Sequence, residues 1–175
     1  MPATTNHSHE PDQGRGKPVS ATAVEMTEMV LPNDANTLGN ILGGKVMHLI
    51  DIACAVAAHR HCRRPVVTVS MDSLDFRHPI KVGELIIIKA SVNRVFKTSM
   101  ECGAKVFSED LNTGERKHTS TAYLTFVALD ENKRPTRVEP IIPETEDEKR
   151  RWRAAAIRRE FRMQEKARLK INYTP

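Results

Sequence analysis

The stretch that decides the fold is NDANTLGNILGGKVMHLIDIACAVAA, residues 33–58. Its first eight residues are rich in Asn, Asp and Gly, which favour turns and left-handed backbone conformations, so we expect a loop there. The apolar residues that follow recur at helical intervals, which predicts a helix with one buried face. They are Leu42, Val46, Leu49, Ile50, Ala53 and Ala57. We expect this helix to end between His59 and Cys62, because Arg64 precedes a proline and is pushed out of the helical region.

Outward from this helix, the chain contains runs with the alternation typical of β-strands. One run precedes the loop, at residues 21–31, and four follow the helix, at residues 66–76, 83–96, 99–110 and 117–129. The two-residue link 97–98 predicts a hairpin. A change of alternation at Leu74 and Phe76 predicts a β-bulge near Ser73. We therefore expect an α+β domain in which four strands form an antiparallel meander, the helix covers one face and the other face is left for a partner.

The 175 residues suit a single globular domain of ordinary size. We expect a disordered leader at 1–18, a globular domain at 19–130, a proline-containing linker at 131–144 and a basic helix at 145–175. Thr145 and Glu148 have capping-box spacing at the start of that helix. Its thin apolar stripe consists of Trp152, Ala156, Ile157, Phe161 and Met163.

The basic charge of the chain is concentrated in this last helix. The formal net charge is +5 and the pI is near 9.3, yet the surplus of basic residues falls entirely within residues 145–170. The rest of the chain is neutral, so a nucleic-acid partner is not expected. No apolar run is long enough to span a membrane and the start does not resemble a secretion signal. Three cysteines without CxxC spacing favour reduced thiols and a cytoplasmic location.

Asp51 is the one carboxylate on the apolar helix. It lies about 140° around the helix from Val46, on the flank of the buried face. If that flank is desolvated, at a dimer interface or in a cleft, the carboxylate is suited to act as a base. An ordinary, partly exposed acid is the alternative. Gly43 and Gly44 open the same helix, either for close packing of the turn or because the free N–H groups of the first turn polarise a substrate carbonyl.

Other candidate residues carry weaker signals. Asn36 and Asn40 are either turn residues or amides that position a water or a carbonyl oxygen. The run HRHC, residues 59–62, suggests a metal site, but no second ligand pair has suitable spacing, so no metal is expected. Cys62 lacks a local activating motif, and the chain contains no GxSxG, P-loop or GxGxxG motif.

Several segments resemble the hotdog-fold acyl-CoA thioesterases, in the branch of the bacterial acyl-CoA hydrolases and the brain-type cytosolic enzymes. They are residues 31–61, VVTVSMDSLDFRHPIKVGE (66–84), KTSMECGAKV (97–106) and TGERKHTSTAYLTFVAL (113–129). The resemblance covers residues 24–129, and the ordered set of D-x-N, GG and helical Asp is its most specific part. One departure is Leu42, where many relatives have His or an aromatic residue, and it concerns the shape of the acyl pocket.

The resemblance implies a hotdog fold, an antiparallel sheet wrapped around one long helix, with an extra C-terminal helix. It implies that Asn36 and Asp51 form a catalytic pair contributed by two subunits, and that Gly44 or its neighbour Gly43 polarises the thioester carbonyl. It further implies that the path of the pantetheine and phosphates is lined by Thr68, Ser70, Lys97, Thr98 and Ser99.

We therefore predict hydrolysis of acyl-CoA to a free acid and coenzyme A, without a cofactor, by a dimer or a trimer of dimers. Two other classes stay open. A non-catalytic module would bind acyl-CoA or, through its basic tail, RNA or an acidic partner. A hotdog dehydratase would need a different His/Asp pattern, which this sequence lacks.

Overall fold

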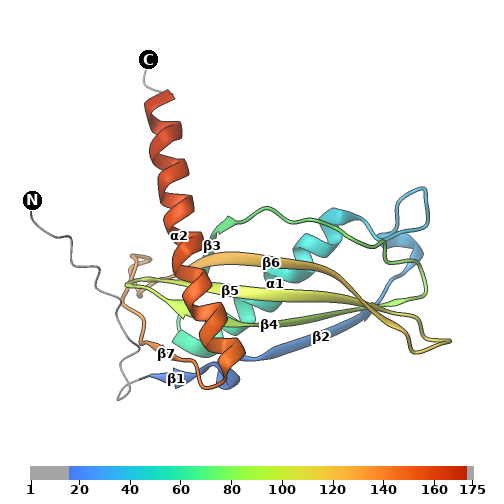
Figure 1. The fold of residues 1–175 in the computed structure, drawn as a ribbon, viewed down its shortest axis with the longest axis horizontal. Helices are drawn as coiled ribbons and strands as arrows, with labels where there is room; N and C mark the ends of the chain where they lie inside the picture. Colours follow the sequence, from blue (N-terminus) through green and yellow to red (C-terminus); the bar gives the residue numbers. More distant parts are fainter. Residues whose placement is uncertain (1–15, 173–175) are drawn as a thin grey trace, which may run out of the picture.

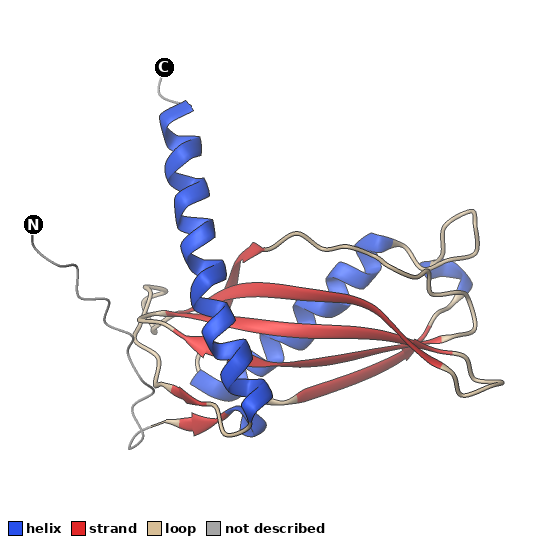
Figure 2. Ribbon diagram, viewed as in Figure 1, coloured by secondary structure: helices blue, strands red, loops and turns tan. Residues whose placement is uncertain are grey.

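The computed structural model describes residues 16–172, so most of the predicted leader and residues 173–175 lie outside the described part. A five-stranded antiparallel sheet with strand order β2-β4-β5-β6-β3 forms the body of the domain (Figures 1 and 2). Its strands are β2 (Val24–Met29), β3 (Val66–Met71), β4 (Leu85–Val95), β5 (Ser99–Glu109) and β6 (Arg116–Ala128). The predicted α+β class and the antiparallel sheet are confirmed.

The predicted helix is α1 (Gly43–Cys62), which crosses one face of the sheet. Leu42 before it has an extended backbone, and the helix ends where Arg63 adopts the left-handed conformation with φ 53°. Arg64 and Pro65 follow, which is the stop that the sequence predicts.

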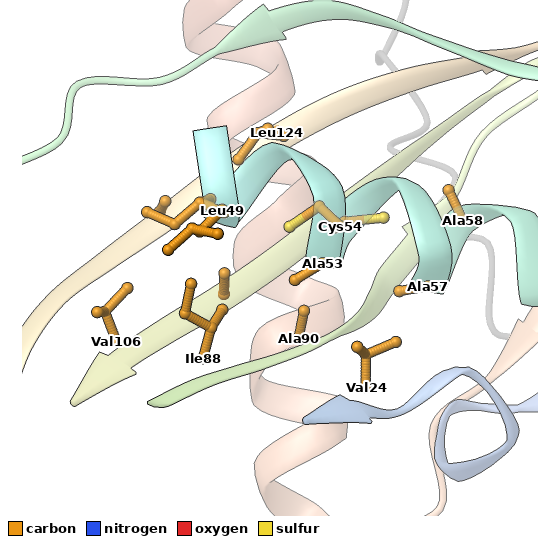
Figure 3. Packing of buried hydrophobic residues seen from close by; sticks show 14 of the residues in the cluster. Val24, Leu49, Ala53, Cys54, Ala57, Ala58, Ile88, Ala90, Val106 and Leu124 are labelled. Carbon is orange, nitrogen blue, oxygen red and sulfur yellow. The ribbon is translucent and has the colours of Figure 1, made fainter. Parts of the chain in front are cut away.

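Small side chains bring α1 close to the sheet. Figure 3 shows its alanines and Cys54 facing residues of four strands across the interface. The helix contributes Leu49, Ala53, Cys54, Ala57 and Ala58, and the sheet contributes Val24, Ile88, Ala90, Val106 and Leu124. All ten are buried. Because this face is packed without space for a polar group, a carboxylate on α1 has to lie on a flank.

The predicted four-strand meander is wrong in one respect. β4, β5 and β6 form the meander, but β3 pairs antiparallel with β6 and lies at the edge of the sheet. Both sides of β4 are occupied, by β2 and by β5, so β3 has no place beside it. β3 also ends at Met71, and its bulge falls between Thr68 and Ser70 instead of near Ser73. The alternation of apolar and polar residues changes at Leu74 and Phe76 because residues 72–76 follow the end of β3 and no longer belong to the sheet.

The face of the sheet predicted to be left for a partner is covered by α2 (Glu146–Asn172) (Figure 1). The capping box is confirmed, since the Glu148 N–H donates to Thr145 Oγ1 at 3.2 Å and the Thr145 N–H donates to Glu148 Oε2 at 2.9 Å. The predicted apolar stripe is wrong for Ile157, Phe161 and Met163, which are exposed, whereas Trp152 packs against the core and the unpredicted Ala155 is fully buried. Polar contacts replace the missing apolar face.

These contacts centre on Glu101 of β5, whose side chain is 0% exposed. Arg158 donates to Glu101 Oε1 at 2.6 Å, and its guanidinium carbon lies 3.6 Å from the centre of the Tyr123 ring. Arg94 of β4 lies over the Trp152 ring at 3.5 Å. Arginines that the sequence presents as a charged surface therefore hold α2 on the sheet.

The predicted linker, residues 131–144, packs on the domain. Within it, β7 (Ile141–Ile142) pairs in parallel with β1 (Lys17–Pro18). His61 Nε2 at the end of α1 lies 2.8 Å from the Glu139 carbonyl oxygen, to which it donates. Burial lowers the pKa of His61, which favours the neutral ring. Short 3₁₀ turns, Val19–Thr22 and Pro32–Asp34, complete the described elements. Neither α1 nor α2 is long and apolar enough to cross a membrane.

Replacing Arg158 by Met is expected to lower the free energy of unfolding by about 3 kcal/mol, because it leaves the buried Glu101 carboxylate short of a cationic partner. Arg150 pairs with the exposed Asp147 on the same helix and provides the matched control. Arg150→Met should cost less than about 1 kcal/mol. Urea unfolding at equal protein concentration measures both, and equal losses would contradict the role given to Glu101.

Candidate active site

Asn36 lies in the loop before α1, and its side-chain oxygen shapes that loop. Asn36 Oδ1 accepts the backbone N–H groups of Leu38 at 2.9 Å and Asn40 at 3.2 Å. Two backbone donors identify this atom as the amide oxygen. The Nδ2 group of Asn36 has no partner among the described residues, so the amide presents a donor outward. Asn40 supplies backbone contacts: its carbonyl oxygen accepts the Asn36 N–H at 2.8 Å.

The N-terminus of α1 is open. Its first intrahelical bond runs from the Val46 N–H to the Leu42 carbonyl, and Leu42 provides no side-chain cap. In the described chain the N–H groups of Gly43, Gly44 and Lys45 have no acceptor, and they lie at the positive end of the helix dipole. A Cβ built on Gly44 would meet no atom within 4 Å. This end of the helix is thus accessible to a carbonyl oxygen.

A cavity of about 340 Å³ connects Asn36 with Gly43. The chain after β3 forms much of its wall, and a Cβ on Gly43 would lie 3.5 Å from the Phe76 ring. The other lining residues are Asn40, Ile41, Val46, Arg77, His78, Pro79, Ile80 and Thr119. Sequence reasoning missed the wall formed by residues 76–80 and Thr119. The only available signal was the broken alternation at Phe76, and nothing local indicates Thr119.

Asp51 lies about 10 Å along α1 from Gly44, on the flank that faces the edge strand. Thr68 Oγ1 of β3 donates to Asp51 Oδ1 at 2.7 Å. This bond leaves Oδ2 available, and the carboxylate is neither fully buried nor fully exposed. Ser70 lies two residues after Thr68 on the same strand, beyond the bulge. The structure therefore joins Asp51 to one of the predicted substrate-binding positions, Thr68, and places Ser70 on the same strand.

The remaining predicted positions, Lys97, Thr98 and Ser99, lie at the other end of the domain. Ser99 pairs with Val127 near one end of β6, whereas Thr119 beside the Asn36 cavity lies near the other end. Eight residues of extended strand separate the two points by roughly 26 Å. Within one copy of the chain, the 97–99 turn does not meet Asn36 or Gly44.

The described residues contain no group of three or more His, Cys, Asp and Glu side chains that could hold a metal ion. All three cysteines are free. Burial raises the pKa of the Cys54 thiol, and the neighbouring Asp51 carboxylate raises it further. Burial likewise raises the pKa of Cys102. Neither thiol is suited to nucleophilic attack near neutral pH.

Known proteins are similar to this chain in sequence and fold. The sequence model of the thioesterase superfamily matches residues 38–115. The uncharacterized acyl-CoA thioester hydrolase YkhA of Bacillus subtilis is 46% identical over 125 residues, which cover 71% of this chain and 73% of that protein. A solved hexameric acyl-CoA thioesterase in its apo form is 40% identical, with a TM-score of 0.85, over 87% of this chain and 98% of that chain.

The acyl-CoA hydrolase of Staphylococcus aureus, solved with butyryl coenzyme A, coenzyme A and coenzyme A disulfide, is 31% identical with a TM-score of 0.81. The alignment covers 90% of this chain and 97% of that chain. Structures also exist for its variants in which one Asn, one Asp or one Thr is replaced by Ala. Those positions are separated by 15 and 17 residues, the separations of Asn36, Asp51 and Thr68 here.

The sheet, the helix and these similarities define a class: the chain belongs to the thioesterase superfamily, with the hotdog fold. Within that superfamily it is one of the acyl-CoA thioester hydrolases, as the sequence predicts.

In the native protein Cys62, the least buried cysteine, should react first with a thiol reagent, and Cys54 and Cys102 should react only after unfolding. Cys62→Ser should keep the hydrolase activity. Thiol titration with and without denaturant measures the first result, with the denatured chain as the control for all three thiols. Rapid native labelling of Cys54 together with loss of activity would contradict the assignment.

Proposed function

We propose that the chain hydrolyses acyl-CoA thioesters to a carboxylic acid and coenzyme A, with Asp51 of one subunit and Asn36 of another at each active site. The observation that carries this proposal is the hydrogen bond between Thr68 and Asp51. It joins two of the three residues whose types and separations match the substituted positions of the Staphylococcus aureus hydrolase.

A second copy of the chain is proposed to pair along β3. This strand is an edge of the sheet, so one row of its backbone N–H and C=O groups is unpaired. Apolar side chains beside that edge are 37–48% exposed: Met47, Ile52 and Val56 on α1, and Val67 and Val69 on β3. A self-complementary contact here would bury them and would place Asp51 and Thr68 at the subunit interface. The hexameric relative supports a trimer of such dimers.

In the proposed reaction the Asp51 carboxylate takes a proton from water as the water oxygen attacks the thioester carbonyl carbon. The Thr68 hydroxyl occupies Oδ1 and orients the carboxylate, so that Oδ2 faces the water. The tetrahedral intermediate collapses with cleavage of the carbon–sulfur bond. The products are the carboxylate of the acid and the thiolate of coenzyme A, which takes up a proton.

The partner subunit supplies the other two parts of the site. Asn36 orients the water or the thioester oxygen as a donor, through the Nδ2 group that its loop contacts leave available. The carbonyl oxygen lies at the N-terminus of α1, where the Gly44 N–H stabilises its developing negative charge. Gly43 is proposed to line the same point of the substrate site, next to the Phe76 ring. No metal or cofactor is proposed, and coenzyme A enters only as part of the substrate.

For the rest of coenzyme A we propose a path along Thr68 and Ser70, ending at the Lys97, Thr98 and Ser99 turn. Because this turn lies at the far end of its own domain, it would serve a site that another subunit helps to build. Hydroxyl groups and a lysine are suited to the amides and phosphates of the substrate.

The polyanion-binding alternative loses support from the contacts of the basic helix. Arg150 and Arg151 pair with Asp147, and Arg158 and Arg162 pair with Glu101. Much of the positive charge on the helix is thus neutralised within the domain. A cytoplasmic location stays a prediction, consistent with three free cysteines.

Asp51→Asn should lower turnover by about 10²–10⁴-fold, because it removes the base and keeps the size of the side chain. Asn36→Ala should lower turnover by about 10²-fold or more. Release of free thiol from acyl-CoA substrates of several chain lengths measures both, with urea unfolding to verify that each variant folds.

Co-refolding the two variants tests the shared site. Hybrid dimers contain one site with both residues intact, so random 1:1 mixing should restore up to about a quarter of the wild-type activity. Near-normal turnover by Asp51→Asn would refute the proposed base. If the two variants exchange subunits and the mixture still has no activity, the proposal that Asp51 and Asn36 act together across the subunit interface is refuted.

Gly44→Ala separates stability from activity. The added methyl meets no atom of the chain and replaces a poor helix former, so the free energy of unfolding should rise by up to about 1 kcal/mol. The same methyl would stand where the carbonyl approaches, and turnover should fall roughly tenfold or more. Urea unfolding and the thiol-release assay measure the two effects. A variant with unchanged turnover would exclude Gly44 from the site.

A further inference from the structure

A compact cluster of four charged side chains joins α2 to the face of the sheet opposite α1. It consists of Glu101 on β5, Asp72 directly after β3, and Arg158 and Arg162 on α2. The two carboxylates and two guanidinium groups balance in charge. Glu101 is fully buried, and the side chains of Arg162 and Asp72 are only 15% and 18% exposed. Such partly desolvated pairs are less screened by solvent than surface ion pairs.

Within this cluster Arg162 makes a contact that Arg158 does not. Its Nη1 donates to both oxygens of Asp72, at 3.0 and 2.7 Å, and its Nη2 donates to Glu101 Oε2 at 3.2 Å. One guanidinium therefore ties a residue at the end of the edge strand to a strand in the middle of the sheet. Arg158 holds α2 on Glu101 and Tyr123 without reaching Asp72.

The strand that ends at Asp72 is a short strand with an irregular register. Within the described part of one subunit, β3 has six residues and pairs with β6 alone, and its register shifts between Thr68 and Ser70. The other six-residue edge strand, β2, pairs without a shift. Thr68 is the residue that donates to Asp51. A bulge leaves one residue out of the ladder, so an anchor at the end of the strand restricts how far Thr68 can move. The Met71–Leu124 pair and the backbone bond from the Asp72 N–H to the Tyr123 carbonyl, at 2.9 Å, also support that end.

We propose that Arg162 is a positioning residue of the hydrolase, which through Asp72 holds β3 so that Thr68 stays bonded to Asp51. This inference rests on the proposed role of Asp51 as the base. α2 then has a function in catalysis although it lies on the opposite face of the sheet. Without the anchor, β3 shifts at its bulge and the Asp51 carboxylate loses the hydroxyl that orients it.

Asp72→Asn and Arg162→Gln test this inference. Each should lower turnover about tenfold, since a displacement near 1 Å at a reacting group can cost up to 10²-fold. The loss should lie in kcat with KM nearly unchanged, because the base is misoriented while the substrate site is kept. A merely destabilised enzyme would regain its kcat once the rate is divided by the folded fraction measured by urea unfolding. Arg162→Lys, which keeps one charged contact, should recover part of the lost kcat.

Arg158→Gln is the matched control. It weakens the hold of α2 on Glu101 and leaves the Arg162–Asp72 contact in place, so kcat per folded enzyme should not change. Hydrogen exchange of the peptide covering residues 66–72 gives a readout independent of activity, and it should accelerate in Asp72→Asn but not in Arg158→Gln. Unchanged exchange and an unchanged kcat in Asp72→Asn would overturn the inference.

A double-mutant cycle with Thr68→Ala decides the route. Thr68→Ala should itself lower kcat, and Asp72→Asn should lower it no further in that background. Additive losses would show that Asp72 acts by another path and would overturn the inference. If Thr68→Ala lowers kcat and Asp72→Asn does not, the anchor fails while the proposed base survives. If Asp51→Asn stays active, the proposed function fails first.

Discussion

The close packing of α1 on the sheet constrains everything else in this domain. Ala53, Ala57 and Ala58 let the helix lie near the strands, and this interface admits no polar group. Asp51 therefore lies on the flank, where the edge strand offers the Thr68 hydroxyl. The same packing fixes the direction of the helix, so that its unpaired N–H groups open toward the cavity beside Asn36. A short run of small residues thus places both the acid and the electrophilic end of the helix.

The parts of the structure that the sequence predicted are those determined locally. The helix bounds follow from periodicity, from the turn-forming residues of the loop before it and from Pro65 after it. The capping box at Thr145 depends on residues three positions apart. The link 97–98 specifies a hairpin because its flanking strands are adjacent in sequence. Asn36, Gly44 and Asp51 could be proposed as site residues because one continuous segment contains them all and carries a family resemblance.

The parts that were missed depend on contacts between distant residues. Alternation of apolar and polar residues identifies a strand but not the strand beside it. β3 pairs with β6 because both sides of β4 are already occupied, by β2 and by β5. Thr119 reaches the Asn36 cavity through sheet register, which single-strand patterns do not encode. The docked face of α2 was misassigned because its partners, Glu101 and Tyr123, lie on strands far away in the sequence. The arginines of α2 suggest a solvated surface when only the sequence is considered. The structure shows that two of them pair with the buried Glu101 carboxylate.

The two faces of the sheet use opposite physical means. Under α1 the packing is apolar, which gives a large stabilisation but little orientation of individual groups. Under α2 the contacts are charged and directional, and their net contribution to stability is reduced by the desolvation of the ions. What such contacts supply is geometry: a forked guanidinium fixes two carboxylates at once, as Arg162 does with Asp72 and Glu101. This geometry matters most for β3, a bulged edge strand whose Thr68 donates to the proposed base Asp51. The charged contacts under α2 therefore complement the apolar packing under α1, because they fix the position of a strand that apolar packing alone would allow to shift.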